Sequence, residues 1–356
     1  MTILFAILIF SFLIFIHELG HFVAAKLSGI QVNEFALFMG PAIWQKQVGE
    51  TLYSLRCIPI GGYCAMEGED GEEGESDNPR SFQKAAWWKR FLILVAGASM
   101  NFVAGVLIFA IVFLPQNVVM APVIAQLDDC CVFGGADGLQ VGDEILSIDG
   151  EEVIVNGDIS LLFQLNPAGV HDVVVLRDGK TLVFDDLNMT HIHTNEDGTQ
   201  YTHYGIHYGM PRELDLPGRF GYVWDNVVNT VRNVRLSLQM LLTGKAGLAD
   251  MSGPVGIVNI MSDVAESSET IFEAVMNMLY FGGFLGINLA VMNLLPIPAL
   301  DGGRVVGLLI STGYEAVTKK KLNPKYEGWI HGAGMVLLLI LMGIIMFKDI
   351  FVIFVG

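Results

Sequence analysis

One five-residue motif, His17-Glu18-Leu19-Gly20-His21, carries the residue types of a metal-dependent hydrolase. On a helix, this HExxH spacing places the two histidines one turn apart on one face, with the glutamate beside them. Imidazoles are zinc ligands, and a neighbouring carboxylate can accept a proton from a zinc-activated water whose pKa is lowered to roughly 7. The motif therefore predicts a zinc-dependent hydrolase, with His17 and His21 as metal ligands and Glu18 as the general base.

The HELGH motif lies within an apolar run that begins at Met1. Ionisable residues in a segment of membrane-spanning length are costly, so they indicate a function. The chain has 356 residues, of which 53% are hydrophobic and 16% charged, and its mean hydropathy is +0.53. This balance is typical of a membrane protein with a modest soluble insert. The net charge of -17 argues against nucleic acid as a partner.

Four stretches are long and apolar enough to cross a bilayer. The first could be mistaken for a signal peptide, but it has no Lys or Arg before Lys26 and carries the HELGH motif, so we interpret it as a retained helix. The four predicted spans are Thr2–Ala25, Phe91–Leu114, Ile271–Leu295 and Ile330–Phe354.

Basic residues predict the orientation of these spans. Lys and Arg crowd the loop between the first two spans, and neither occurs from Phe91 to Leu176. The next strong cluster, Lys319-Lys320-Lys321 with Lys325, lies between the last two spans. By the positive-inside rule, those two loops are cytoplasmic and the segment from about 115 to 270 is extracytoplasmic. The HELGH motif then lies near the cytoplasmic end of its span.

A catalytic zinc site needs a third protein ligand, and the segment Asn293–Gly303 offers Asp301. It follows the third span, which reaches the cytoplasmic face, so Asp301 arrives at the depth of the HELGH motif. Pro296 and Pro298 must interrupt the helix before it. A proline-broken helix end with a capping aspartate is the simpler alternative, but the matching depth favours Asp301 as a ligand.

These motifs resemble the site-2 protease family of intramembrane zinc metalloproteases, in its bacterial regulator-of-sigma form with one PDZ domain. The resemblance implies that His17, His21 and Asp301 bind zinc, that Glu18 is the catalytic base and that Asn293 contacts the substrate backbone. The chain departs from the family at Gly97–Asn101, where Gly-Pro is usual. Further similarity lies in Phe35–Pro41, Ile58–Tyr63 and Ser252–Ile257.

Two short strands are predicted at Glu34–Trp44 and Thr51–Ile60, around a turn at Gln47-Val48-Gly49. A transmembrane substrate must unwind before its carbonyl can reach zinc, so this hairpin could hold it as an added strand, with Phe38 and Gly40 in contact. An ordinary cytoplasmic hairpin is the alternative.

The extracytoplasmic segment resembles a PDZ domain over roughly Val119–Leu187, where the stretch Gly138–Gly150 alternates apolar and polar residues between turn glycines. The loop before the usual peptide groove is altered at Cys130–Gly135, so a steric filter for substrates already trimmed outside is an alternative to binding a chain end. Beyond it, apolar spacing predicts an interfacial helix over Tyr222–Leu242.

Other candidate ligands are weaker. Several histidines follow the PDZ-like segment. A second metal site formed by them is one interpretation, and solvated positions on a strand are the other. The four cysteines lack CxxC spacing, which favours neither structural zinc nor a disulfide framework, although a Cys57–Cys64 bond stays open. The histidines concerned are His191, His193, His203 and His207, and the remaining cysteines are Cys130 and Cys131.

The predicted fold is a polytopic α-helical membrane protein with four transmembrane helices, a cytoplasmic-side β-hairpin and an inserted extracytoplasmic PDZ-like α+β domain. The predicted function is zinc-dependent cleavage of single-span membrane proteins, such as anti-sigma factors or remnant signal peptides, after a first cut by another protease, in a bacterial inner membrane. A transporter or a PDZ-bearing adaptor is the alternative. The predicted membrane domain has two halves, residues 1–114, which include the hairpin at 34–63, and residues 271–356. Between them lie the PDZ-like domain, 115–190, and an extracytoplasmic linker with the interfacial helix, 191–270.

Overall fold

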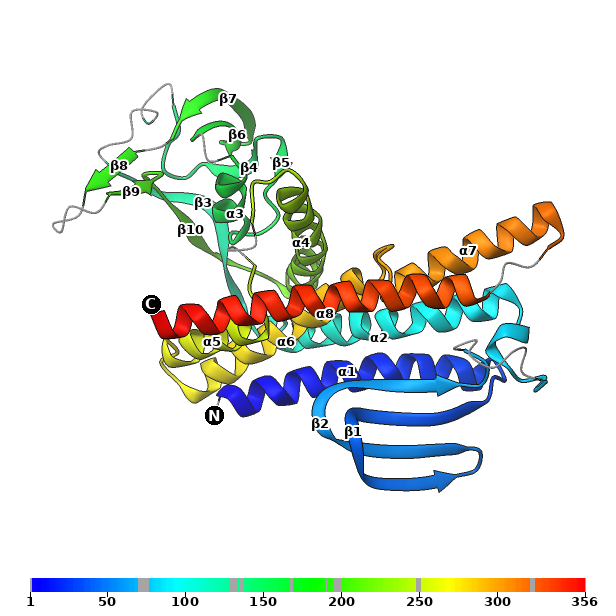
Figure 1. Cartoon of the computed structure of the whole chain (residues 1–356). Coiled ribbons are helices and arrows are strands. Elements are labelled where there is room, and N and C mark those ends of the chain that lie inside the picture. The colour runs from blue at the N-terminus through cyan, green and yellow to red at the C-terminus, as the bar shows by residue number, and fades with distance from the viewer. Residues whose placement is uncertain are drawn as a thin grey trace. The chain divides into compact units, whose positions relative to one another are not determined.

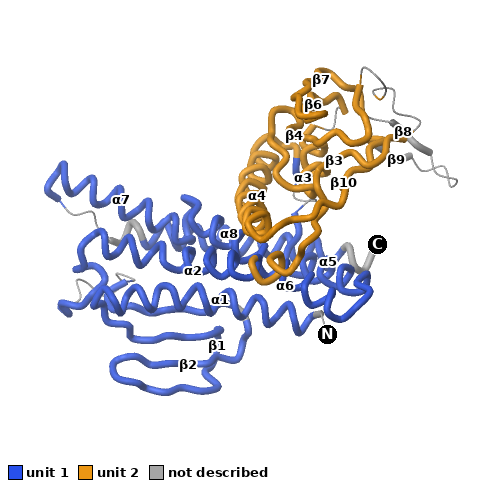
Figure 2. The backbone as a smooth tube through the Cα atoms, turned by 180° about the vertical axis from the view of Figure 1, so that it is seen from behind, with its two compact units in different colours: residues 1–109, 246–356 blue, residues 110–245 orange. Residues whose placement is uncertain are grey.

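A computed structural model gives the fold of this chain (Figure 1). It divides into two compact units, one formed by residues 1–109 with 246–356 and one by residues 110–245 (Figure 2), and each is described by itself. The structure describes residues 2–69, 77–128, 134, 138–166, 169–189, 191–194, 200–247, 251–320 and 324–355.

The described part of the chain contains four helices long and apolar enough to cross a membrane, which confirms a polytopic membrane protein. α6 ends at Asn293 because the two prolines that follow cannot continue it. Two further helices, α5 and α7, were not predicted. The long helices are α1 (Thr2–Leu27), α2 (Trp87–Phe113), α6 (Ile271–Asn293) and α8 (Pro324–Val355), and the shorter ones are α5 (Pro254–Glu266) and α7 (Asp301–Thr318).

Helix α1 packs against α5 and α6 through a buried apolar cluster. Leu13 of α1 is fully buried there, together with Met261 of α5 and Met278 of α6. At its other end, α1 packs on the sheet formed by β1 (Val32–Val48) and β2 (Thr51–Met66). The helix that carries the HELGH motif is thus held at both ends within the first unit.

The predicted hairpin is present, but its strands are longer and bend back on themselves. Phe35 pairs with both Tyr53 and Cys64, so the part of β1 around it lies between two parts of β2. The bend in β1 falls at Phe38 and Gly40, whose φ angles of 71° and 84° are left-handed. The result is a four-segment sheet in the order 42–48, 51–56, 32–37 and 62–66, rather than a simple two-stranded hairpin. The register rises together between the two central segments, which therefore run parallel, while each outer segment is antiparallel to its neighbour.

The second unit is an α+β domain built on a sheet with strand order β10-β3-β4-β6-β7 and β5 beside β4. The sheet extends past the predicted domain end at residue 190, because β10 pairs with β3. Residues 129–133 and 135–137, which include most of the altered groove loop, lie outside the described residues. The strands are β3 (Val118–Leu127), β4 (Glu144–Ile148), β5 (Glu151–Glu152), β6 (Val170–Arg177), β7 (Lys180–Asn188), β8 (His191–Thr194), β9 (Gln200–His203) and β10 (Ile206–Glu213), with the 3-10 helix η1 (Phe82–Lys84) in the first unit.

Helix α4 (Leu216–Leu242) contains the predicted helix and starts six residues earlier than expected. Leu236 on one face joins the core of the second unit, where α3 (Asp158–Leu165) also packs. Phe220 and Trp224 are exposed on α4. Contact of this exposed part with a membrane surface stays a prediction.

The remaining histidine and cysteine predictions have simple structural outcomes. β8 and β9 pair so that His191 lies opposite His203, while His207 Nε2 is 3.0 Å from Asp128 Oδ1. Cys57 and Cys64 are free thiols, so no disulfide joins them.

Candidate metal centre

Three side chains from two distant parts of the sequence meet in the first unit. His17 Nε2 lies 3.2 Å and His21 Nε2 3.4 Å from Asp301 Oδ2. The two histidine Nε2 atoms are themselves 3.2 Å apart. Each residue therefore offers one donor atom, and these atoms all lie within 4.8 Å of one another. Sequence reasoning predicted all three, and the structure brings them together.

Helix geometry orients the two histidines. Both lie on α1 at a spacing of four residues, and their rings meet edge to face with centroids 4.8 Å apart. His21 Nδ1 lies 2.8 Å from the Ile93 carbonyl oxygen, which as an acceptor fixes the proton on Nδ1. Nε2 is then left free to bind a metal, the arrangement that outer partners commonly impose on metal-ligating histidine.

Two glycines allow α1 and α2 to approach at this point. A Cβ on Gly20 would overlap the Ala96 carbonyl oxygen, and a Cβ on Gly97 would overlap His21 Nε2. Side chains of any size at these positions would separate the helices or displace the imidazole. The glycine of HELGH and the first residue of the atypical Gly97–Asn101 segment are therefore both required by close packing.

Asp301 is the first residue of α7, directly after the turn that follows α6. Its Oδ2 atom is buried and lies within 3.4 Å of both imidazole Nε2 atoms. A buried carboxylate oxygen of this kind is costly unless a charge balances it. Two imidazole nitrogens and one carboxylate oxygen are the donor set of a catalytic zinc site, which keeps a fourth position open. The residues present therefore fit zinc.

Glu18 lies on α1 between the two histidines in sequence and faces the sheet. A Cβ on Gly62 of β2 would come within 3.2 Å of Glu18 Cγ, so this carboxylate borders both the histidine face and strand segment 62–66. Arg304, one turn after Asp301, forms an ion pair with Glu69 just beyond β2. This ion pair joins α7 to the end of the same strand.

Sequence reasoning did not single out His331, in α8. Its Nδ1 accepts a hydrogen bond from the Ala299 N–H at 3.1 Å, in the turn just before Asp301. An ionisable residue within a predicted membrane span is itself a functional signal, and that signal could have found it.

The three predicted substrate contacts are placed less directly. Asn293 is the last residue of α6, and Phe38 and Gly40 lie at the bend of β1. The Gly40 carbonyl accepts a hydrogen bond from Arg56 at 2.7 Å. Among the described residues, no hydrogen bond or ion pair joins any of the three to His17, His21 or Asp301, so their role stays a prediction.

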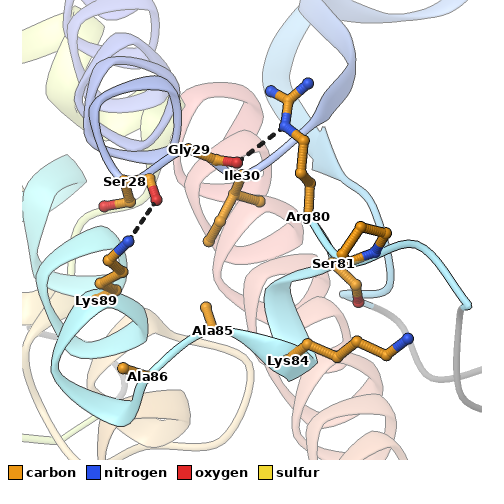
Figure 3. Close-up of a pocket in the computed structure, with 10 residues that line it drawn as sticks. Ser28, Gly29, Ile30, Arg80, Ser81, Lys84, Ala85, Ala86 and Lys89 are labelled. Atoms are coloured by element: carbon orange, nitrogen blue, oxygen red, sulfur yellow. Dashed lines mark hydrogen bonds between the residues drawn. The ribbon is translucent and has the colours of Figure 1, made fainter.

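A pocket elsewhere in the first unit is lined by residues that follow α1, by the loop before α2 and by the first turn of α2, and its basic residues are Arg80, Lys84 and Lys89 (Figure 3). Lys89 donates to the Ser28 carbonyl at 2.9 Å and Arg80 to the Gly29 carbonyl at 3.0 Å. None of His17, His21 and Asp301 lines it. The pocket is therefore separate from the metal centre and belongs to the connection between α1 and α2.

Known proteins are similar to this chain over most of its length. The family model described as Peptidase family M50 matches residues 5–341. The chain is 34% identical over 355 residues to a provisionally named zinc metalloprotease of Clostridium perfringens, covering 98% of each chain. It is 30% identical over 429 residues to the regulator of sigma-W protease RasP of Bacillus subtilis, again covering 98% of each.

Proposed function

This chain belongs to peptidase family M50, the site-2 proteases, and is a membrane-embedded zinc metalloprotease; from that premise we propose which residues act and on what. We propose that His17, His21 and Asp301 hold the zinc and that the enzyme cleaves transmembrane segments of single-span membrane proteins. The observation that carries the proposal is the convergence of three donor atoms within 4.8 Å from helices far apart in sequence.

Glu18 is the proposed general base and acid. When bound, zinc supplies a Lewis acid that polarises the scissile carbonyl and makes a water molecule more acidic. The Glu18 carboxylate takes the proton of that water and later gives it to the departing amine nitrogen. Burial of His21, which is 8% exposed, excludes bulk water from one side of the cluster.

The proposed substrate platform is the β1–β2 sheet. A helical peptide bond is enclosed in its own hydrogen bonds, so the substrate must be extended where it is cut. Segment 62–66 pairs on one side with segment 32–37 and borders Glu18, which supports this edge as the strand that a substrate joins. Asn293, Phe38 and Gly40 are the proposed side-chain and backbone contacts around it.

The proposed topology places the metal centre near the cytoplasmic face of a bacterial inner membrane and the PDZ-like unit outside. Of the basic residues that line the pocket in Figure 3, Arg80 and Lys84 lie between α1 and α2 and Lys89 lies in the first turn of α2, which supports a cytoplasmic loop by the positive-inside rule. We propose that the PDZ-like unit acts as a steric filter for substrates already trimmed by another protease.

The replacement Glu18→Gln tests the proposed function. Cleavage of a single-span reporter in proteoliposomes should fall by at least about 100-fold, the usual contribution of a general base. The zinc content should stay at the wild-type level, because this replacement leaves all three donors in place. Cleavage at the wild-type rate by a zinc-loaded Glu18→Gln protein would refute the assignment of the base. An Asp301→Ala protein that binds as much zinc as the wild type would refute the assignment of the third ligand.

A further inference from the structure

The backbone just before Asp301 adopts a conformation that it would not hold unaided. Ala299 has a φ of 78°, in the left-handed region that is unfavourable for a residue with a Cβ. It lies between Pro298 and the first turn of α7. Whatever holds Ala299 in this conformation also sets the direction in which the chain enters Asp301.

Helix α8 supplies the contacts that hold it. The Ala299 N–H donates to His331 Nδ1 at 3.1 Å. One turn along α8, a Cβ on Gly334 would overlap Pro298 Cβ and come within 2.8 Å of its carbonyl carbon. The missing side chain of Gly334 therefore lets α8 lie directly on the Pro298–Ala299 turn, with His331 above it. For His331 to accept this hydrogen bond, its ring must be neutral and protonated on Nε2.

We infer that His331 is a positioning residue for zinc binding: it locks the left-handed Ala299 turn, and thereby places the Asp301 carboxylate against His17 and His21. This inference rests on the proposed role of Asp301 as a zinc ligand. His331 would not bind the zinc itself, because its Nδ1 accepts a hydrogen bond from the backbone of Ala299, two residues before Asp301. Residues that orient a metal ligand without binding the metal themselves typically weaken metal binding about 10- to 100-fold when they are lost, and His331 is proposed to be such a residue.

Two replacements at position 331 separate the hydrogen bond from the ring. His331→Ala removes the acceptor, whereas His331→Asn keeps an oxygen near the place of Nδ1. We expect purified His331→Ala to lose zinc to a chelator about 10- to 100-fold more readily than the wild type, and His331→Asn to recover most of that loss. Gly332→Ala is the matched control, because a Cβ there meets no atom within 4 Å.

A second-site replacement tests the backbone mechanism. Ala299→Gly removes the Cβ that makes the left-handed conformation costly, so the double variant with His331→Ala should hold zinc better than His331→Ala alone. Backbone hydrogen exchange of the zinc-free proteins should show faster exchange at residues 299–301 in His331→Ala than in the wild type. A structural role confined to packing would give neither rescue nor this local change.

The outcomes distinguish this inference from the proposed function. If the wild type binds zinc through Asp301 and His331→Ala retains zinc equally well, the inference is wrong and the proposed function stands. If Asp301→Ala binds zinc as the wild type does, the proposed ligand set is wrong. Zinc loss in His331→Ala that neither His331→Asn nor Ala299→Gly reverses would also overturn the positioning role.

Discussion

Gly97 sets the space available to His17 and His21, the two proposed zinc-binding histidines. A Cβ at this position would overlap His21 Nε2 and lie within 2.8 Å of His17 Cε1, so it would press on both proposed ligands. Overpacking of this kind typically costs about 1–3 kcal/mol. Because His21 Nδ1 is anchored on Ile93, the ring cannot simply slide along its helix. The strain should therefore appear in the metal site.

The replacement Gly97→Ala should weaken zinc binding about 5- to 150-fold, the equivalent of that strain. Zinc affinity measured by competition with a chelator checks this, and cleavage should fall in parallel. Gly343→Ala in α8 is the control, since a Cβ there meets no atom within 4 Å. Unchanged zinc affinity in Gly97→Ala would mean that the helices yield and the ligands do not.

The sequence predicts the proposed ligands but not the residues that hold them. His17, Glu18 and His21 follow from one local motif, and Asp301 follows from a turn at matching membrane depth. His331 and Gly97 act through contacts with backbone or ring atoms far away in sequence, at 32 residues for the Ala299–His331 pair. Nothing in local periodicity records such a contact, so the supporting residues required the structure.

The end of α1 is tied to two loops through Glu50. Lys26 donates to Glu50 at 2.6 Å, and Arg80 donates to both of its oxygens at 2.6 and 2.9 Å. The hydrogen bonds from Arg80, and then those from Lys26, lower the pKa of Glu50 from 4.5 to about 2. The turn of the β-sheet, the loop before α2 and the helix that carries HELGH are thus joined at one carboxylate.

A lowered pKa stabilises the fold above the ordinary pKa of the group and loses this effect as the pH falls through the lowered value. The stability difference between the wild type and Glu50→Gln should therefore be constant above about pH 5 and shrink between pH 4.5 and 2. Thermal unfolding in detergent across this range checks it. Adding Arg80→Gln should move the loss to higher pH, and a pH-independent difference would contradict the ion pair.

Strand segment 62–66 and strand segment 42–48 are the two edges of the β1–β2 sheet. The first borders Glu18, and the second is separated from it by two other segments. If a substrate joins the first edge, Ala65→Pro should lower cleavage strongly while zinc content stays unchanged. Gln45→Pro at the other edge is the matched control and should leave cleavage near wild type. Equal losses in both variants would argue against the added strand.

Elements were predictable from sequence where one signal dominated. Four apolar runs predicted the four long helices, and alternation over Gly138–Gly150 predicted β4 in the second unit. Helix α7 was missed because it is short and amphipathic and directly follows a proline-rich turn. The four-segment sheet was missed because its bend depends on left-handed backbone at Phe38, a residue type that gives no such signal. Pairing of β10 with β3 is a long-range contact with the same lack of local evidence.

The chain combines a membrane unit that contains the candidate metal centre with a second unit inserted in sequence between α2 and α5. The second unit has its own buried core, including Ile145, Phe163 and Val173, and so can act as a rigid body on the proposed extracytoplasmic side. A rigid filter predicts a threshold in the size of the substrate's external part. A peptide-binding groove instead predicts dependence on the residues at its exposed end.

A series of single-span reporters with external segments of decreasing length distinguishes these two modes. The wild type should cleave short reporters and leave long ones intact, with a steep change at one length that is independent of the terminal sequence. Unfolding the inserted unit selectively, with Val173→Asp in its core, should let longer reporters be cut while Glu18→Gln in the same background still abolishes cleavage. Cleavage that falls gradually with length, or that follows the terminal residues instead, would support a binding groove and refute the filter.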